Sequence, residues 1–297
     1  MTSKTNLVFI TALAGYVLGR SVELSAYQQI LSYLISVFVF TTIFPSMLLF
    51  RFERLKISKK PLFASLFLNF VFSPLYAFLV FRIVQDETMS LSLASLLLMP
   101  VPSMNAMYVL ISGGALELSV SLMTLNFLMG IALYPILLSL LTGIHGIEIN
   151  IFQIVRSLLV VIVLPIILGQ MIGKFATPSR EIISRLTEIS LNALVFTVFF
   201  SKAEFVHPSS FLVQFPYSAA FILGAIILSE VISWIMRIPK AEHLSYVFVS
   251  AGKNNSTVIA ILTLSLSPIY AVYVMFHQFI QIFLLLMYAR IKAEKII

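Results

Sequence analysis

A lysine and two asparagines interrupt an apolar stretch in the last quarter of the chain. Residues 249–260 read VSAGKNNSTVIA and place Lys253, Asn254 and Asn255 between hydrophobic runs. A charged side chain costs about 2.5–3.5 kcal/mol at the centre of a membrane on insertion scales, so a lysine at that depth indicates a functional site by default. Its chemistry would be electrostatic, as a counter-charge for an anionic ligand.

A second polar interruption occurs in the first half, where residues 98–107 read LMPVPSMNAM. Pro100 and Pro102 lack backbone donors and would break a helix, and Gly252 in the other interruption tolerates unwinding in the same way. Backbone groups freed at membrane depth are acceptable only where protein or a water-filled cavity satisfies them. We therefore expect two discontinuous helices that cross.

The elements around these interruptions are predicted to be transmembrane helices. Of the 297 residues, 60% are hydrophobic and 10% are charged, and the mean hydropathy is +1.05. A spanning helix needs about 20 apolar residues, so an all-α chain of this length has room for about ten. The apolar runs lie at 7–19, 30–50, 62–82, 91–112 and 117–142, and then at 151–174, 184–202, 211–236, 244–266 and 269–289.

The basic residues predict the orientation of these ten spans. The side that holds both termini carries 14 of the 19 lysines and arginines, and Lys253 lies inside a span. The opposite side carries four, namely Arg20, Arg82, Arg156 and Lys202. Because basic residues concentrate on the cytoplasmic side, both termini are expected in the cytoplasm, with the chain in the cytoplasmic membrane. The net charge of +7 is then explained by the orientation of the spans in the membrane and does not indicate a nucleic-acid partner.

Two halves of the chain carry matching glycine motifs. Residues 15–20 and residues 169–174 each read as GxxxG followed by a basic residue, near the ends of the first and sixth spans. Either motif alone is an ordinary small-residue packing face. Their matched positions predict an internal repeat, 1–143 and 144–297. Since each half has five spans, the second must be inverted, an arrangement typical of secondary transporters with sites at broken helices near the midplane.

Several other classes of protein are excluded by what the sequence lacks. It has no cysteine, which removes disulfides, thiolate metal sites and cysteine nucleophiles. It has no HExxH or GxSxG motif, no phosphate loop, and one aspartate, Asp86, in a predicted loop. We predict that the protein is not an enzyme and uses no cofactor, no metal and no nucleotide. A receptor or scaffold would not need mirrored helix breaks.

Over essentially its full length the chain resembles the bile acid:sodium symporter superfamily, which also includes the arsenite efflux permeases. Residues 119–135, preceded by Gly113-Gly114, resemble the family's fifth span, residues 267–278 the tenth, and residues 251–255 the crossover in the ninth. The resemblance implies a panel domain of spans 1, 2, 6 and 7 and a core domain of spans 3–5 and 8–10. It also implies alternating access and a sodium site beside the crossing of spans 4 and 9.

The chain departs from the sodium-coupled pattern at the residues that matter most. Those members begin the ninth-span motif E-x-G-x-Q-N with a glutamate, and this chain has Ser250 at that position. The family's Ser-Asn pair falls near Asn105 and Ala106, and a ligating threonine falls at Met123. The carboxylate that would bind sodium is therefore absent.

Three interpretations of Lys253 remain open at this point. It replaces the sodium ion with a fixed charge, which leaves proton coupling open, or it is the counter-charge of an anionic substrate, and these two are compatible. Alternatively it pairs with a carboxylate that locks the core. Glu230 is the candidate, because it is the only acidic residue well inside an apolar run and replaces an asparagine of the family's pattern.

The sequence thus predicts a secondary transporter of a small organic anion, with that substrate and the lipid bilayer as its partners. The alternatives are a sodium-coupled symporter of the bile acid type and an arsenite efflux permease. The latter group uses a cysteine near Met104 and a glutamate near Thr257, both missing here, and uncharged arsenous acid would gain little from a lysine. The predicted substrate and ion site comprises Ser103, Asn105, Asn126, Glu230, Ser250, Lys253, Asn254, Asn255 and Gln278.

Overall fold

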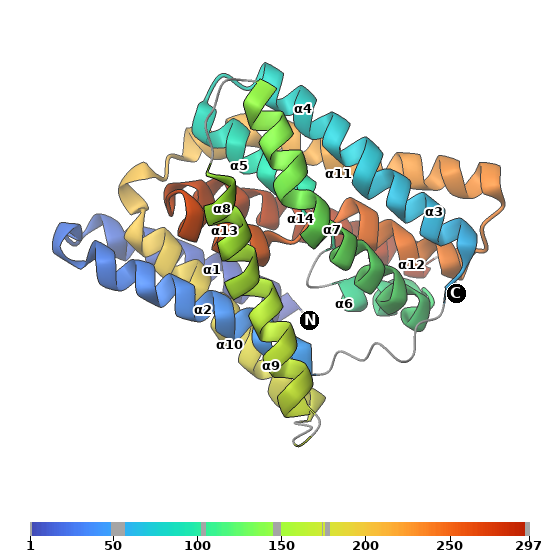
Figure 1. Cartoon of the computed structure of the whole chain (residues 1–297), viewed down its shortest axis with the longest axis horizontal. Helices are drawn as coiled ribbons and strands as arrows, with labels where there is room; N and C mark the ends of the chain where they lie inside the picture. Colours follow the sequence, from blue (N-terminus) through green and yellow to red (C-terminus); the bar gives the residue numbers. More distant parts are fainter. Residues whose placement is uncertain are drawn as a thin grey trace. The chain divides into compact units, whose positions relative to one another are not determined.

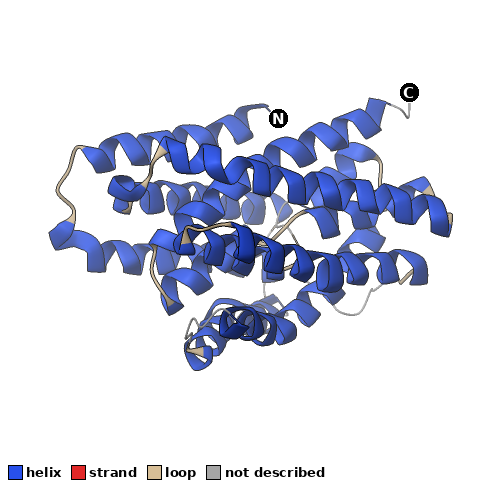
Figure 2. Ribbon diagram, turned by 90° about the horizontal axis from the view of Figure 1, so that it is seen from above, coloured by secondary structure: helices blue, strands red, loops and turns tan. Residues whose placement is uncertain are grey.

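Helices make up nearly all of the described chain in the computed structural model. The structure describes residues 2–48, 57–101, 105–144, 150–173, 175 and 179–294, and no β-strand occurs in these ranges (Figure 2). The first half contains α1 (Thr2–Arg20), α2 (Gln28–Leu48), α3 (Lys59–Phe67), α4 (Ser73–Ile83), α5 (Glu87–Leu98), α6 (Asn105–Ser112) and α7 (Leu116–Ile144) (Figure 1). The second half contains α8 (Ile151–Leu158), α9 (Leu164–Gly173), α10 (Arg180–Ser201), α11 (Pro208–Met236), α12 (Lys240–Ala251), α13 (Asn255–Ser265) and α14 (Ile269–Glu294).

Five helices in the described ranges are long and apolar enough to cross a membrane. Two pairs of elements are continuous through a π-helical segment, α3 with α4 through Leu68–Phe72 and α8 with α9 through Leu159–Val163. The five candidates are Lys59–Ile83, Leu116–Ile144, Glu181–Ser201, Ser209–Met236 and Ile269–Ala293. They coincide with five of the predicted spans, so the all-α class is confirmed, while the count of ten spans and the inverted repeat stay predictions.

The predicted fourth and ninth spans are each interrupted. α5 ends at Leu98 and α6 begins at Asn105, whereas α12 ends at Ala251 and α13 begins at Asn255. α5 and α12 have 12 residues each. At 1.5 Å per residue each is about 18 Å long, too short to cross the hydrocarbon core of about 30 Å alone. The discontinuity expected from the proline and glycine positions is therefore present in both spans.

The chain divides into two compact units, and each takes segments from both halves. Unit 1 comprises Met1–Arg51, Asn150–Leu212 and Ser256–Met275, and so contains α1, α2, α8, α9, α10 and α13. Unit 2 comprises Phe52–Ile149, Val213–Asn255 and Phe276–Ile297, and so contains α3 to α7, most of α11, α12 and most of α14. Met99–Val101, Gly252–Asn254 and the helices α5, α6 and α12 beside them belong to unit 2, whereas α13 belongs to unit 1 from Ser256 onward.

Glycines let the helices of unit 1 approach closely. A Cβ on Gly15 would lie 2.5 Å from the carbonyl oxygen of Phe196, and one on Gly19 would lie 2.3 Å from that of Phe200. The first GxxxG motif is thus the face of α1 that packs against α10, as small-residue motifs do in membranes. Helices α1 and α10 run side by side in Figure 1.

The second GxxxG motif packs against a different helix. A Cβ on Gly173 of α9 would lie 3.1 Å from the carbonyl oxygen of Leu48, the last residue of α2. Exchanging the two halves of the chain turns the pair of α1 and α10 into the pair of α9 and α2. Such reciprocal packing is what an internal repeat requires.

α12 is enclosed by protein in unit 2. It lies against α3, α6 and α7, and every residue from His243 to Ala251 is buried. Its Tyr246 and Val249 join a cluster with Ala64, Leu68, Leu118 and Leu122. A lipid-facing helix would keep one face exposed in the protein alone, so the half-helix that leads to Lys253 is an interior element.

The close approach of α1 to α10 predicts a position-specific effect of a single methyl group. Gly19→Ala should destabilise the protein by about 1–3 kcal/mol, because the new Cβ meets backbone atoms that cannot move independently. The melting temperature of the purified protein in detergent measures this effect. Gly143→Ala is the matched control, since no described atom lies within 4 Å of a Cβ there, and alanine favours the helix by up to about 1 kcal/mol. Equal melting temperatures for the two variants would contradict the prediction.

Candidate binding site at the paired helix breaks

The two helix interruptions contact each other. Pro100 and Lys253 form an antiparallel bridge, and the amide of Asn254 donates to the carbonyl of Met99 at 3.3 Å. Each interruption thereby supplies backbone partners to the other, which meets the requirement that irregular backbone inside a membrane be satisfied by protein.

The interruption in the fourth span holds a strained residue. Val101 has a φ of 77°, a left-handed conformation that costs a β-branched residue on the order of 1–3 kcal/mol. The neighbouring α7 fits closely around this segment, because a Cβ on Gly130 would lie 2.6 Å from the ring of Pro100. Packing against α7 therefore maintains the strained backbone.

Gln281 of α14 clamps the backbone of the second interruption. The amide of Lys253 donates to Gln281 Oε1 at 2.7 Å, and Gln281 Nε2 donates back to the carbonyl of Lys253 at 3.3 Å. That carbonyl also accepts from the backbone amide and the side-chain Nδ2 of Asn255, at 3.1 and 3.2 Å. The peptide groups that leave the helix are thus paired on both sides of the lysine.

The ammonium of Lys253 is fully buried and has neutral neighbours. The residue is 0% exposed, and Nζ donates to Asn69 Oδ1 at 2.9 Å and lies 5.1 Å from the centroid of the Phe221 ring. No carboxylate lies within ion-pair distance of Nζ in the described part of the chain. Dipoles and an aromatic face, which attracts cations, therefore stabilise the charge without neutralising it.

A chain of buried polar groups continues from the ammonium. Asn69 Nδ2 donates to Asn126 Oδ1 at 3.0 Å, Asn126 Nδ2 donates to Ser65 Oγ at 3.0 Å, and Ser65 Oγ donates to the carbonyl of Leu62 at 2.9 Å. Because the ammonium can only donate, it fixes the direction of every bond in this chain. Asn69 lies in the π-helical segment Leu68–Phe72, and such local insertions are frequent at functional sites.

Glu230 does not pair with Lys253. Its carboxylate accepts from the hydroxyl of Tyr288 at 2.6 Å, forms an ion pair with Lys292, and lies 3.4 Å from His243 Nε2. Glu230 lies less than two turns from the end of α11, where the last turns of α14 supply its partners. The interpretation that this carboxylate neutralises the intramembrane lysine is therefore wrong.

The remaining predicted residues differ in their surroundings. Ser103 lies outside the described residues. Ser250 donates to the carbonyl of Tyr246 one turn earlier in its own helix, at 2.9 Å. Asn254 contributes the backbone bond between the two interruptions described above.

Three other predicted residues carry buried amide oxygens that have no hydrogen-bond partner among the described residues. Asn105 donates through Nδ2 to Ser119 Oγ at 2.6 Å, but its Oδ1 has no partner. The Oδ1 of Asn255 and the Oε1 of Gln278 are likewise buried and unpartnered. Buried polar atoms are nearly always satisfied, so such oxygens indicate places where a ligand or ion can supply the missing partner.

Sequence reasoning did not rank the three side chains that hold the lysine. Asn69 and Gln281 were visible as polar residues in apolar spans, but pattern alone does not say which of several such residues faces Lys253. Phe221 is one of 26 phenylalanines and gave no signal.

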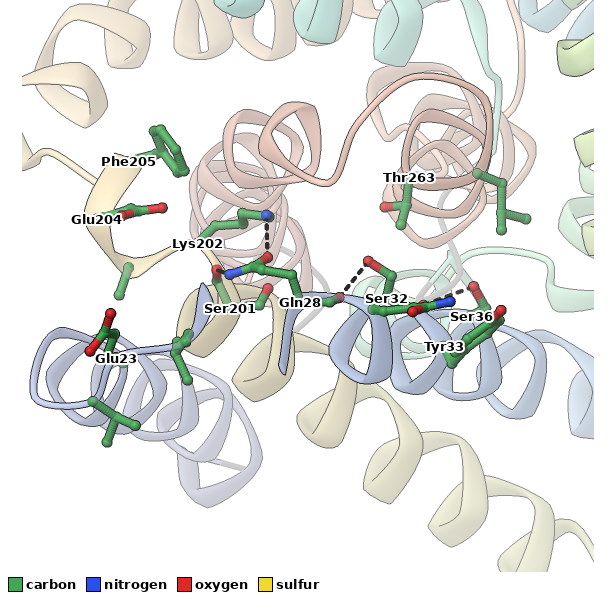
Figure 3. A pocket seen from close by; sticks show the side chains of 16 residues that line it. Glu23, Gln28, Ser32, Tyr33, Ser36, Ser201, Lys202, Glu204, Phe205 and Thr263 are labelled. Carbon is green, nitrogen blue, oxygen red and sulfur yellow. Dashed lines mark hydrogen bonds between the residues drawn. The ribbon is translucent and has the colours of Figure 1, made fainter. Parts of the chain in front are cut away.

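Unit 1 contains a separate polar pocket that the sequence did not predict. A cavity of about 1010 Å³ lies beside the C-terminal end of α1, the start of α2 and the end of α10 (Figure 3). Lys202 Nζ points toward Gln28 and donates to its Oε1 at 2.7 Å, and Gln28 Nε2 donates to the carbonyl of Ser201 at 3.3 Å. Glu23 and Glu204 also line the pocket, so it is not selective for anions by charge alone.

The clamp by Gln281 predicts local opening when it is removed. Gln281→Leu leaves the buried amide of Lys253 without its acceptor, at a cost of about 1–3 kcal/mol. Hydrogen exchange of the peptide that contains residues 252–256 should become about 5- to 150-fold faster, as measured by mass spectrometry. Phe283→Leu on the same helix is the control, because Phe283 is 62% exposed. Unchanged exchange in the Gln281 variant would argue against the clamp.

Comparison with known proteins identifies the family of the chain. Residues 8–207, more than half of the chain, match the model of the sodium bile acid symporter family. The matched region includes the first helix break and ends before Lys253. No curated protein matches the chain. Members of the matched family are transporters and not enzymes, and the apolar helices agree with a multi-pass membrane protein. The chain therefore belongs to the sodium bile acid symporter family.

Proposed function

We propose that this protein is a secondary transporter that moves a small organic anion across the cytoplasmic membrane by alternating access. Lys253 supplies a fixed positive charge at the binding site, in the position that relatives leave to a sodium ion. One observation carries the proposal. A fully buried ammonium lies where two broken helices meet, bonded to a neutral amide and without a carboxylate partner among the described residues.

The energetics of the ammonium favour an anionic substrate. Burying an unpaired charge costs several kcal/mol, and a neutral amide offsets only part of this. An ammonium has three donors, and Asn69 accepts one of them. A carboxylate or sulfonate that enters the site would accept the others and neutralise the charge. The half-helices α6 and α13 begin directly after the two interruptions, so their positive N-terminal ends also favour an anion.

Alternating access needs two bodies that move as units. In this proposal unit 1 serves as the panel domain and unit 2 as the core domain. Lys253, Asn69 and Gln281 all belong to unit 2, so the fixed charge and its supports would move together.

A sodium-coupled symporter is the second candidate. The family match favours it, and so do the unpartnered amide oxygens of Asn105, Asn255 and Gln278, because neutral oxygens are suitable ligands for hard cations. Ser250, which stands where sodium-coupled relatives have a glutamate, opposes it. Efflux of arsenite is favoured by the patterns at residues 125–129 and at Asn254-Asn255, which look closer to that branch, but it is opposed by the absence of cysteine.

Transport in proteoliposomes distinguishes these candidates. We expect uptake of at least one of three radiolabelled probes, pyruvate, succinate or taurocholate, without stimulation by a sodium gradient. Lys253→Met should reduce this uptake about tenfold or more, because loss of a charged hydrogen bond to substrate is worth about 1.5–3 kcal/mol. Lys240→Gln, at an exposed position on α12, is the control. Sodium-driven uptake that survives Lys253→Met would overturn the fixed-charge proposal and favour the second candidate.

The distribution of basic residues predicts the location of the termini. Green fluorescent protein fused to either end should fluoresce, because it folds in the cytoplasm. A phosphatase that is active only in the periplasm should be inactive at either end. Opposite results at the two ends would require an odd number of spans and would contradict the inverted repeat.

A further inference from the structure

A second polar cluster lies in unit 2, away from the substrate site. His243, in the first turn of α12, is buried, with only 4% of its surface exposed. Titratable and polar side chains face its ring from all three helices of the cluster. They are Glu230 and Ser233 on α11, Tyr246 on α12, and Tyr288 and Lys292 on α14.

The Nδ1 atom of the imidazole begins a chain of three contacts. Nδ1 lies 2.7 Å from Ser233 Oγ, which lies 3.1 Å from the hydroxyl of Tyr246. Tyr246 donates its proton to the carbonyl of Ser229 at 2.6 Å. Each contact in this chain needs one proton.

The Nε2 atom lies near two acceptors. Nε2 lies 3.0 Å from the hydroxyl oxygen of Tyr288 and 3.4 Å from Glu230 Oε2. Tyr288 donates its only proton to Glu230 Oε1 at 2.6 Å. Because the Tyr288 proton is already donated to Glu230, both neighbours of Nε2 can only accept. Nε2 must therefore carry a proton to make a favourable contact.

Counting protons shows that a neutral imidazole cannot complete this network. With the proton on Nε2, the first chain has two protons, those of Ser233 and Tyr246, for its three contacts. With the proton on Nδ1, the first chain is complete, but Nε2 presents a lone pair to a carboxylate. When both nitrogens carry protons, Nδ1 donates to Ser233, Ser233 donates to Tyr246, and Nε2 donates toward Tyr288 and Glu230. Every hydrogen bond of the first chain then has its own proton, and the Nε2 proton is shared between Tyr288 and Glu230.

We propose that His243, together with Glu230, forms a proton-binding site that couples transport to the proton gradient. The coupling rests on the proposed function, whereas the binding of the proton does not. A fixed lysine removes the need for sodium but supplies no driving ion, and a proton carried by His243 would fill that role. Because α12 runs from His243 to the interruption at Lys253, a change of charge at its first turn acts on the helix that carries the substrate site.

The charges around His243 keep the proton exchangeable. Burial lowers the pKa of His243 below its usual value, the carboxylate of Glu230 raises it, and the ammonium of Lys292 lowers it. A carrier of this kind must release its proton in one state of the transport cycle. Because these contributions oppose one another, a modest rearrangement of α12 can change the occupancy.

Nitrogen NMR of the full chain tests proton binding without a substrate. The chain has four histidines, so spectra of histidine-labelled protein in nanodiscs can be assigned by comparison with His243→Gln. We expect His243 to be neutral at high pH and to gain its second proton reversibly as the pH is lowered. Glu230→Gln should lower the midpoint by about one pH unit or more. Ser233→Ala should also lower it, since it removes the acceptor of Nδ1. An imidazole that stays neutral at every pH at which the wild-type protein remains folded would overturn the proposal.

Transport then tests coupling separately. In proteoliposomes, an inward proton gradient should raise uptake of the active probe severalfold in the wild type and should have no effect on His243→Gln. His207→Gln, at an exposed position outside the cluster, should keep the wild-type response. Uptake that responds to the proton gradient equally in His243→Gln would refute coupling at this site, even with proton binding established by NMR. A wild type that transports none of the probes would count against the proposed function, and the NMR result would still decide proton binding.

Discussion

The burial of one ammonium at the meeting point of two broken helices is the constraint on which this structure depends. An unpaired charge in a low-dielectric interior is tolerated only when its hydrogen bonds are satisfied and its surroundings are polarisable. Asn69 provides the acceptor, Phe221 provides the aromatic face, and Gln281 holds the backbone in place. All three are neutral, so the positive charge remains available to a ligand. A carboxylate at the position of Asn69 would instead pair with the ammonium.

The irregular backbone at the interruptions follows from the same constraint. Helices satisfy their own peptide groups, and a break inside a membrane must find other partners. Here each break serves the other, through the bridge between Pro100 and Lys253 and the bond from Asn254 to Met99. The left-handed Val101 and the tight contact at Gly130 indicate that local preferences yield to this arrangement. Conflicts between local and global preference are expected at functional sites.

α12 connects the two polar centres of unit 2. Its first turn carries His243, and its C-terminal end leads directly to Lys253. Protein encloses the helix on all sides, so it cannot shift without altering contacts at both ends. In the proposed mechanism a proton near one end and an anion near the other therefore act on one rigid element, which is how coupling between separate sites arises without direct contact.

The class of the protein and the place of its candidate site follow from the sequence alone. The apolar runs of about 20 residues, the prolines at 100 and 102, and the lysine within residues 249–260 identified a helical membrane protein with two interrupted spans. These features are local, because helix breaking and the cost of a buried charge depend on residue type and depth alone. The resemblance to the symporter family rested on residues 119–135, 251–255 and 267–278, and the match over residues 8–207 bears out the membership.

The groups that surround the lysine are known from the tertiary structure alone. Glu230 was the candidate carboxylate in one of three interpretations of the sequence, yet it is bonded to Tyr288 and Lys292, while Asn69, 184 residues away in the chain, accepts a hydrogen bond from the ammonium. The proton-binding cluster at His243 was likewise invisible, since its members come from three helices. Hydropathy and helix breaks are read along the chain, whereas the direction of a side chain inside a bundle is set by helix rotation and packing against several neighbours at once. That information is not contained in any one segment.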